Sequence, residues 1–246
     1  PVQTKVPSCY FLMTRTEAPR TEDASADGGD WSTFNVEKWR DAAHGKGSYF
    51  EGLNEATSET LNEMLKNAKK DGGKGMVVVD VGCGTGELIR DTYADSAYAL
   101  GIDINPMFIN YCKSTMGETE TRKFVVADAL KLTECLEEHI PAEYKDLPRC
   151  LACVGNTLGI MPEGLKNSVI DAMAAATTAK DFMFLVFWDG EHLAHAVENF
   201  YRKNQDLCGS FENHKFDPEN YTLNLQSGYA TRWTDKVQAR QEIESR

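Results

Sequence analysis

The sequence has no apolar stretch long enough to span a bilayer, and no signal peptide is visible. Basic residues are also scarce, since 26 Lys and Arg stand against 38 Asp and Glu and give a net charge of −12. An acidic chain without a basic patch repels phosphate backbones, so we expect neither a membrane nor a nucleic acid as partner. The sequence leaves the oligomeric state open. Because the chain begins at Pro1, we expect the natural N-terminus to be missing or processed.

Paired cysteines and metal-binding patterns are missing as well. The seven cysteines are scattered, and an odd set of this kind indicates reduced thiols in a cytoplasmic protein. Cys150 and Cys153 form a C-x-x-C pair that suits redox chemistry or half of a zinc site, but no second pair follows, which favours a buried strand. The five histidines show no metal spacing, so we expect no metal. Two of them, His44 and His192, are candidates for a catalytic base by position alone.

What the sequence does contain is a short apolar run followed by a glycine-rich turn. Four apolar residues from Met76 lead into Asp80, and Gly82, Gly84 and Gly86 follow at every second position. The β-branched run predicts a buried parallel strand, and the glycines predict a turn where a ligand approaches the backbone closely. The spacing differs from the G-x-G-x-x-G fingerprint of dinucleotide sites, and a carboxylate beside the turn suits a cation better than a diphosphate.

Strand and helix patterns alternate downstream of this turn. Further strands are predicted at 97–103, 123–128, 150–154 and 182–188, with helices at 87–93, 107–116, 130–139, 163–176 and 191–204. Such alternation favours an α/β fold, with a doubly wound, mostly parallel sheet and helices on both faces. We expect residues 1–50 to form an N-terminal extension and lid, with a mobile loop at 15–30, and residues 51–246 to form the main domain.

The D-x-G-x-G-x-G string resembles motif I of the class I S-adenosylmethionine-dependent methyltransferases. The resemblance extends from about Met76 to Gly190. It implies a Rossmann-like sheet of seven strands that finishes with an antiparallel hairpin. The remaining chain offers short strands at 221–225 and 229–233 and a last one at 237–243. The hairpin is therefore expected to be abbreviated, or else a further C-terminal segment is absent.

Acidic residues close three successive predicted strands, at Asp80, Asp103 and Asp128. An acid about 20 residues beyond the glycine turn accepts hydrogen bonds from ribose hydroxyls, which Asp103 fits, although it could instead cap the next helix. The resemblance places Asp128 and the backbone of Ala129 at the adenine, again with a helix cap as the alternative. The full predicted cofactor site is Asp80, Gly82, Cys83, Gly84, Gly86, Asp103, Ile104, Asp128, Ala129 and Asn156.

The predicted methyl acceptor site follows the fourth and fifth strands. Asn156 lies in a Gly-Asn-Thr-Leu string that resembles the Gly-Asn-Ser-type segment of N-methyltransferases of the glycine and sarcosine kind, although it could be a simple turn residue. Asp189 could contact a cationic or hydroxylated substrate, or cap a helix. We expect these two residues to be catalytic and Trp39, Tyr49 and Trp188 to form the lid and substrate wall.

The predicted function is methyl transfer from S-adenosylmethionine to a small soluble acceptor, with S-adenosylhomocysteine as product. The acceptor would be an amine, an amino acid or a thiol metabolite, and the reaction a direct in-line displacement in which positioning supplies most of the rate. A catalytically silent subunit that binds the same cofactor and activates another enzyme is the alternative. A nicotinamide-dependent reductase is disfavoured by the glycine spacing.

Overall fold

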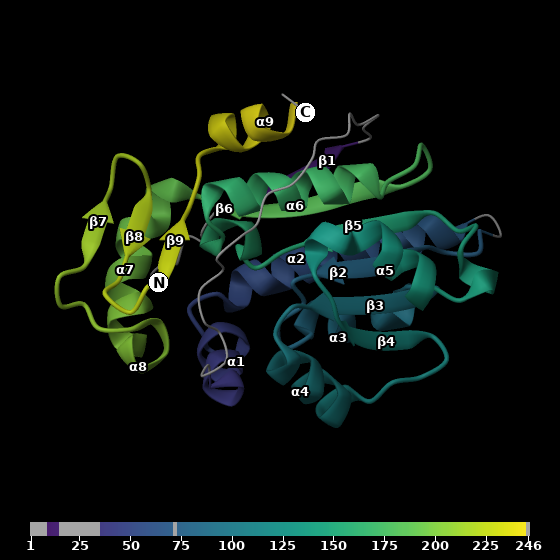
Figure 1. Ribbon diagram of the computed structural model, residues 1–246, viewed down its shortest axis with the longest axis horizontal. Helices are drawn as coiled ribbons and strands as arrows, with labels where there is room; N and C mark the ends of the chain where they lie inside the picture. Colours follow the sequence, from purple (N-terminus) through teal and green to yellow (C-terminus); the bar gives the residue numbers. More distant parts are fainter. Residues whose placement is uncertain (1–8, 15–34, 71–72, 245–246) are drawn as a thin grey trace, which may run out of the picture.

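The computed structural model describes residues 9–14, 35–70 and 73–244, and its centre is a six-stranded sheet (Figure 1). The strand order is β1-β6-β5-β2-β3-β4. The strands are β1 (Cys9–Thr14), β2 (Val77–Val81), β3 (Tyr98–Asp103), β4 (Arg122–Val126), β5 (Arg149–Cys153) and β6 (Phe182–Trp188). From β2 to β6 the strands are parallel, whereas β1 pairs with β6 in the antiparallel sense. The loop predicted at 15–30 lies outside the described residues.

The central strand β2 shows why the apolar run folds as it does. Its valines Val77, Val78 and Val79 are all fully buried. Successive side chains of a strand point to opposite faces, so Val77 and Val79 enter one core while Val78 enters the other. Both faces of the sheet are therefore covered, which is the situation that a continuous β-branched run predicts.

Helices cover both faces of the sheet, as the alternating pattern predicted (Figure 1). Side chains of α2 (Glu51–Lys69), α3 (Glu87–Thr92), α4 (Pro106–Met116) and α7 (Leu193–Asn199) pack on the face that contains Val78. The opposite core contains residues of α5 (Leu132–His139), α6 (Glu163–Ala175) and α9 (Lys236–Glu244). The other helices are α1 (Val36–His44), α8 (Gln205–Cys208), and the 3-10 turns η3 (Tyr93–Asp95), η4 (Ala129–Lys131), η5 (Ala142–Tyr144), η6 (Thr157–Ile160), η7 (Gly190–His192) and η8 (Tyr201–Asn204). The helices predicted between residues 87 and 176 agree closely with the observed ones, whereas the helix expected at 191–204 is broken into η7, α7 and η8.

The expectation of seven strands in the central sheet is wrong, because the C-terminal strands do not join it. The strands predicted at 221–225 and 229–233 are confirmed as β8 (Thr222–Asn224) and β9 (Ala230–Arg232). Together with β7 (Lys215–Asp217) they form a separate antiparallel sheet. Beside β6, the antiparallel edge position is taken by β1 from the N-terminal part of the chain.

The segment 237–243 is the helix α9 rather than a strand. Asp235 begins the helix, because its carboxylate accepts hydrogen bonds from the backbone N–H groups of Val237 and Gln238 at 2.7 and 2.9 Å. Ala239 and Ile243, four residues apart, are both buried against the sheet. This spacing fits one face of a helix, whereas the polar residues between them would have pointed into the core from a strand.

The strand order indicates at which edge of the sheet a ligand is expected to bind. The crossover from β2 leads to β3 on one side, and the later strand β5 returns to the other side of β2. The chain thus winds away from β2 in both directions, and open sheets of this kind bind ligands at that switch point, beyond the carboxyl ends of the strands.

At the opposite edge of the sheet, where β5 and β6 begin, a buried carboxylate joins the two strands through hydrogen bonds. Asp181 precedes β6, is 1% exposed, and accepts hydrogen bonds from Arg149 N, Nε and Nη2 at 2.8, 3.1 and 2.6 Å. Thr178 adds two more through its N–H and Oγ1, each at 2.8 Å. Burial raises the pKa of Asp181, but the hydrogen bonds from Arg149 and Thr178 outweigh it and the net shift is downward.

We expect Asp181→Asn to lower the free energy of unfolding by about 3 kcal/mol at pH 7, because it leaves the Arg149 guanidinium without its counter-charge. Because the pKa of Asp181 is lowered on folding, its contribution is present above its unfolded pKa and is lost as pH falls through the folded one. Urea unfolding at pH 7 and at acid pH measures both effects. Asp206→Asn removes an exposed carboxylate paired with Lys38 and should change stability little; an equal loss in both variants would contradict the assignment.

Candidate active site

A large cavity of about 1130 Å³ lies at the carboxyl ends of β2, β3, β4 and β5. This volume exceeds that of a typical pocket for one small ligand, so it has room for a large ligand together with a second molecule. Residues from the glycine turn, from the ends of these strands and from α1 form its wall. No group of three or more metal-ligating side chains occurs among the described residues.

The three glycines of the turn have different tasks. Gly84 has φ +51° and lines the cavity, and a Cβ placed on it would meet no atom within 4 Å. Gly82, at φ +74°, lines the cavity too, but a Cβ there would collide with Thr157. Gly86 lies behind the wall, where a Cβ would come within 2.4 Å of Met116 Cε. The structure thus places Gly82 and Gly84, together with Cys83 between them, where a ligand can reach them, and gives Gly86 a packing role.

Asp80 is a buried wall residue whose pKa is strongly shifted. It is 1% exposed, and its Oδ1 has no hydrogen-bond partner among the described residues. Burial, assisted by the nearby charges of Asp103 and Glu87, raises the pKa of Asp80 to about 8. A buried polar atom without a partner is rare and destabilising. In the wall of a large cavity it indicates a donor or a cation that arrives with the ligand.

Asp103 and Asp128 both line the cavity, as predicted. Asp103 accepts hydrogen bonds from the N–H groups of Gly84 and Asn105, both at 2.9 Å, while burial raises its pKa. The cap of α4 is Asn105, whose own side chain accepts from the backbone N–H of Met107, so Asp103 is not needed for that purpose. Asp128 does cap η4, through a 2.9 Å bond from the N–H of Leu130, and it also faces the cavity.

Apolar groups complete the wall beside these two acids. Ile104 and Met107 are 66% and 41% exposed although they are large and apolar, and both line the cavity with Ala129 and Leu130. Exposed apolar side chains at the mouth of a cavity fit a flat, weakly polar ring.

Beyond β5, the wall is built by Asn156 and two tryptophans. Asn156 has φ +60° and is 3% exposed, and its Nδ2 donates to Thr231 Oγ1 at 3.1 Å and to the carbonyl of Arg232 at 3.3 Å. Its amide therefore fastens the end of β5 to β9 as well as lining the cavity. Trp39 and Trp188 also line the cavity, and Trp188 Nε1 is buried without a hydrogen-bond partner among the described residues.

The structure does not bring Asp189 or Tyr49 to this cavity. The Asp189 carboxylate caps η7 by accepting from the N–H of Glu191 at 3.1 Å, and it lies 3.4 Å from His192 Nδ1. Asp189 therefore acts as a helix cap, which is one of the two roles that the sequence left open for it. The hydroxyl of Tyr49 contacts His195 Nδ1 at 2.7 Å, and its ring packs edge-on against Phe50.

The wall residues that the sequence did not single out for binding include Tyr229, Met161 and Glu87. Tyr229 comes from the turn between β8 and β9, and no local pattern signals that it reaches the cavity. Glu87 had a visible signal, because it is an acid directly after the last glycine, at the start of α3. His44, at the end of α1, also lines the cavity, whereas His192 does not.

The charge of the cavity wall restricts the classes of ligand that can bind there. Its acidic members are Asp80, Glu87, Asp103 and Asp128, and among the described residues that line it there is no Lys or Arg. Such a wall attracts cations and repels phosphates, because nothing in it offsets a negative charge. It therefore disfavours a dinucleotide and fits a cofactor that carries positive charge.

The sequence matches the model of the methyltransferase domain family over residues 72–222, which is more than half of the chain. The chain therefore belongs to the methyltransferase domain family, and its class is that of the S-adenosylmethionine-dependent methyltransferases. A comparison with curated protein sequences gave no match. Within the described residues, no helix combines the length and apolar character that crossing a membrane requires.

Solved structures share the fold at low sequence identity. Magnesium protoporphyrin IX methyltransferase from Synechocystis PCC 6803, with bound S-adenosylhomocysteine, is 14% identical over 87% of this chain and 84% of that one, with a TM-score of 0.51. The 1,6-didemethyltoxoflavin-N1-methyltransferase of Burkholderia thailandensis is 10% identical over 92% and 81%, with a TM-score of 0.49. An amino pentose methyltransferase from Micromonospora echinaspora is 14% identical over 65% and 55%, with a TM-score of 0.40. The chain thus spans little more than half the length of some structures that it matches.

The cavity fits S-adenosylmethionine on the chemistry of its own groups. The cofactor carries a sulfonium and an ammonium, and the wall offers the unpartnered Oδ1 of Asp80, with no Lys or Arg beside it in the described part of the lining. The open space over Gly84 admits a ligand against the backbone. When bound, the cofactor supplies an activated methyl group.

We expect Gly84→Ala to weaken the affinity for S-adenosylhomocysteine at least tenfold, because the new methyl group would stand in the cavity. Gly117→Ala is the matched control. Gly117 also has a positive φ, +69°, and also has open space around its Cβ position, but it does not line the cavity. Both variants share the backbone strain. Calorimetric titration of both variants decides the point, and equal losses would show that strain alone is responsible.

We expect the Asp80→Asn variant to gain thermal stability over the wild type as pH rises from 5 to 8 in the absence of ligand. The pKa of Asp80 is raised to about 8 on folding, so its favourable contribution is complete below its unfolded pKa and declines as pH rises through 8. The difference in unfolding free energy should grow by up to about 1.4 kcal/mol per pH unit. Thermal unfolding across this range tests it, and parallel curves for the two proteins would refute the raised pKa.

Proposed function

We propose that this protein transfers a methyl group from S-adenosylmethionine to a small acceptor that is neutral or cationic, with an amine as the favoured class. The observation that carries the proposal is the buried Oδ1 of Asp80, which has no hydrogen-bond partner among the described residues, in a large cavity whose described lining includes no Lys or Arg. A carboxylate-rich cavity disfavours an acceptor with net negative charge, because its wall would leave that charge unpaired.

The strand order orients the cofactor in the proposed complex. β3 and β4 lie on one side of β2, and β5 and β6 lie on the other. In our assignment Asp80 pairs with the ammonium, Asp103 with the ribose hydroxyls, and Asp128 with Ala129 at the adenine. The methyl group then points toward the side of β5, where Asn156 and Trp188 line the same cavity.

The acceptor side of the cavity combines aromatic faces with one free donor. Trp39, Trp188 and Tyr229 line it, and aromatic faces attract ammonium groups. The unpartnered Nε1–H of Trp188 suits an oxygen on the acceptor. We therefore propose an acceptor that carries an amine as nucleophile and an oxygen within a few bonds of it, as amino acids and amino alcohols do.

Direct displacement needs little from the protein apart from alignment. The sulfonium leaves as a neutral thioether, so no anion has to be stabilised, and the wall acts by holding the nucleophile in line with the methyl carbon. In this reaction Asn156 fixes the end of β5 through its bonds to β9. The side chain thus maintains the shape of the wall that aligns the two reactants.

Several broader expectations stay predictions. α1 supplies Trp39 and His44 to the cavity, so we propose that the part of the chain before α2 acts as a lid. A small-molecule partner, the absence of a nucleic-acid partner and a cytoplasmic location rest on composition alone. The silent-subunit alternative predicts cofactor binding without turnover.

Calorimetry with S-adenosylmethionine, S-adenosylhomocysteine and NAD, followed by a radiolabelled methyl-transfer screen over amines, amino acids, amino alcohols and thiols, tests the proposal. We expect binding of the first two ligands only, and turnover of an amine that also carries oxygen. In Trp188→Phe, KM for that acceptor should rise roughly tenfold, the scale of one lost hydrogen bond, while affinity for S-adenosylhomocysteine stays constant. Binding of NAD instead of the sulfonium cofactor would refute the proposal, and binding without turnover would support the silent subunit.

A further inference from the structure

We propose that His44 is the general base that takes a proton from the methyl acceptor, and that Glu87 is the residue that positions it. This inference rests on the proposed function. It assigns a chemical task to two cavity residues that cofactor binding does not use.

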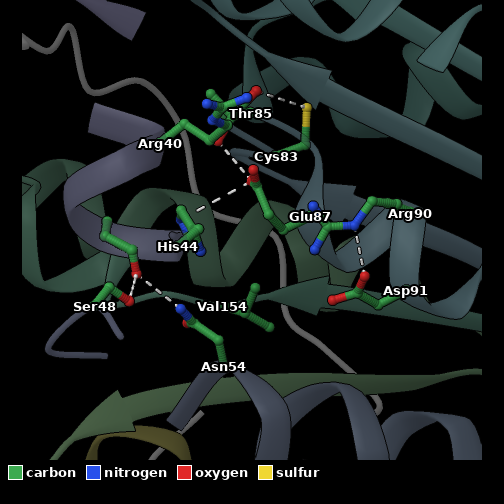
Figure 2. A network of polar contacts seen from close by, with 12 residues as sticks. Arg40, His44, Ser48, Asn54, Cys83, Thr85, Glu87, Arg90, Asp91 and Val154 are labelled. Carbon is green, nitrogen blue, oxygen red and sulfur yellow. Dashed lines mark hydrogen bonds and ion pairs between the residues drawn. The ribbon is translucent and has the colours of Figure 1, made fainter. Parts of the chain in front are cut away.

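The two residues come from different helices and meet at the wall of the cavity. His44 is the last residue of α1 and Glu87 is the first residue of α3, directly after the glycine turn. His44 Nε2 lies 4.0 Å from Glu87 Oε2, and Val154 at the end of β5 lies close by (Figure 2). Because His44, Glu87 and Val154 all line the cavity, the pair stands between the glycine turn and the acceptor side.

The two ring nitrogens of His44 differ in what surrounds them. Nε2 is directed toward Glu87, whose Oε2 also accepts a 2.6 Å hydrogen bond from Thr85 Oγ1 (Figure 2). Nδ1 is buried and has no hydrogen-bond partner among the described residues. A carboxylate next to one nitrogen favours the proton on that nitrogen and leaves the lone pair on the other. The geometry thus leaves Nδ1 free to accept a proton from a ligand.

The charges around His44 keep the imidazole neutral in the free protein. Burial lowers the pKa of His44, and of the charged groups that act on it Glu87 and Asp91 oppose this shift while Arg90 reinforces it. Arg90 and Asp91 are paired with each other at 2.7 Å, which limits their separate effects. On α1 itself, Arg40 is hydrogen-bonded to Asp41 and to Tyr111 of α4. A neutral imidazole at pH 7 is the form that a base requires.

The chemical step balances without any further reactant. An acceptor that arrives as an ammonium transfers one proton to Nδ1 of His44, and its nitrogen regains a lone pair. That lone pair forms the new bond to the methyl carbon while the carbon–sulfur bond breaks and its electron pair stays on sulfur. The products are S-adenosylhomocysteine, a methylated ammonium and a protonated His44, which returns its proton to water when the products leave.

A carboxylate neighbour alone does not distinguish His44 from the other histidines. His192 also lies beside a carboxylate, with its Nδ1 3.4 Å from Asp189, and its Nδ1 also lacks a hydrogen-bond partner. However, neither His192 nor Asp189 lines the cavity. His192→Gln is therefore the matched control, because it removes a similar pair outside the site.

Nuclear magnetic resonance of the histidine-labelled protein with S-adenosylhomocysteine tests the inference without any acceptor. The His44 signal, assigned by its loss in His44→Gln, should show a neutral ring at pH 7 with the proton on Nε2. In Glu87→Gln the preference for that tautomer should weaken. A charged ring at pH 7, or a proton on Nδ1, would overturn the proposal, and this holds whether or not the acceptor is known.

The kinetic test uses the acceptor found in the methyl-transfer screen. His44→Gln should lower kcat by roughly 10²- to 10⁴-fold, the usual range for a lost general base, with affinity for S-adenosylhomocysteine within about twofold of wild type. The loss should shrink as pH approaches the pKa of the free amine, because water then removes the proton. His192→Gln should behave as wild type, and Glu87→Gln should shift the acid limb of the pH profile.

The possible outcomes distinguish a failure of the His44 assignment from a failure of the proposed methyl-transfer function. If the wild type transfers no methyl group, the proposed function fails, while the resonance experiment still decides the state of His44. If His44→Gln keeps both its kcat and the acid limb of its pH profile, the function stands and His44 is not the base. A kcat loss that does not respond to pH would also overturn the inference, because it would indicate a purely structural role.

Discussion

The buried Oδ1 of Asp80 has no hydrogen-bond partner among the described residues, and the properties of the site follow from that constraint. Asp80 is the last residue but one of the central strand β2, is almost inaccessible, and lies near Asp103 and Glu87, whose charges oppose its ionisation. A lysine or arginine in the wall would relieve the strain but would also take the place of a cationic ligand. The lining contains neither within the described residues, and in the proposed complex the positive charge of the ligand would offset the cost of burying this carboxylate.

Competition for backbone N–H groups decides which acids face the ligand. Asp103, Asp128 and Asp189 each lie at or just after the end of a strand, where an acid can begin the next helix, and the sequence alone left two roles open for each of them. Asn105 caps α4 and leaves Asp103 to the cavity, Asp128 caps η4 while still facing the cavity, and Asp189 is used by η7. An acid is left to face the cavity when a second residue that can cap the helix follows it. For Asp103 this residue is Asn105, so the sequence could have predicted that Asp103 is not needed as the cap.

The sequence predicted the parallel strands and the glycine turn well because their signals are local. Buried β-branched runs, positive-φ glycines and helix caps act within a few residues of where they stand. Long-range choices were not predictable in the same way. Nothing near Cys9–Thr14 indicates that this strand pairs with β6, and the apolar residues of 237–243 are too few to separate a strand from a helix. For the same reason Tyr229 was missed and Tyr49 was expected at a cavity that it does not reach.

The two sides of the cavity are built from different parts of the chain, and the hydrogen bonds between Asn156 and β9 join them. The donor wall is encoded by the short stretch from β2 to η4, where nearly every position is constrained by the others. The proposed acceptor wall includes Tyr229, which directly precedes β9, and the Asn156 amide fastens β9 to the end of β5. Backbone bonds between Trp188 and Thr234 and between Gly190 and Thr234 hold the segment after β9 beside the end of β6. The small sheet can therefore drift in sequence and change which molecules are admitted, while the chemistry of the donor stays fixed. In a protein with this arrangement, substitutions in the small sheet can change the acceptor specificity while the residues that bind the methyl donor stay the same.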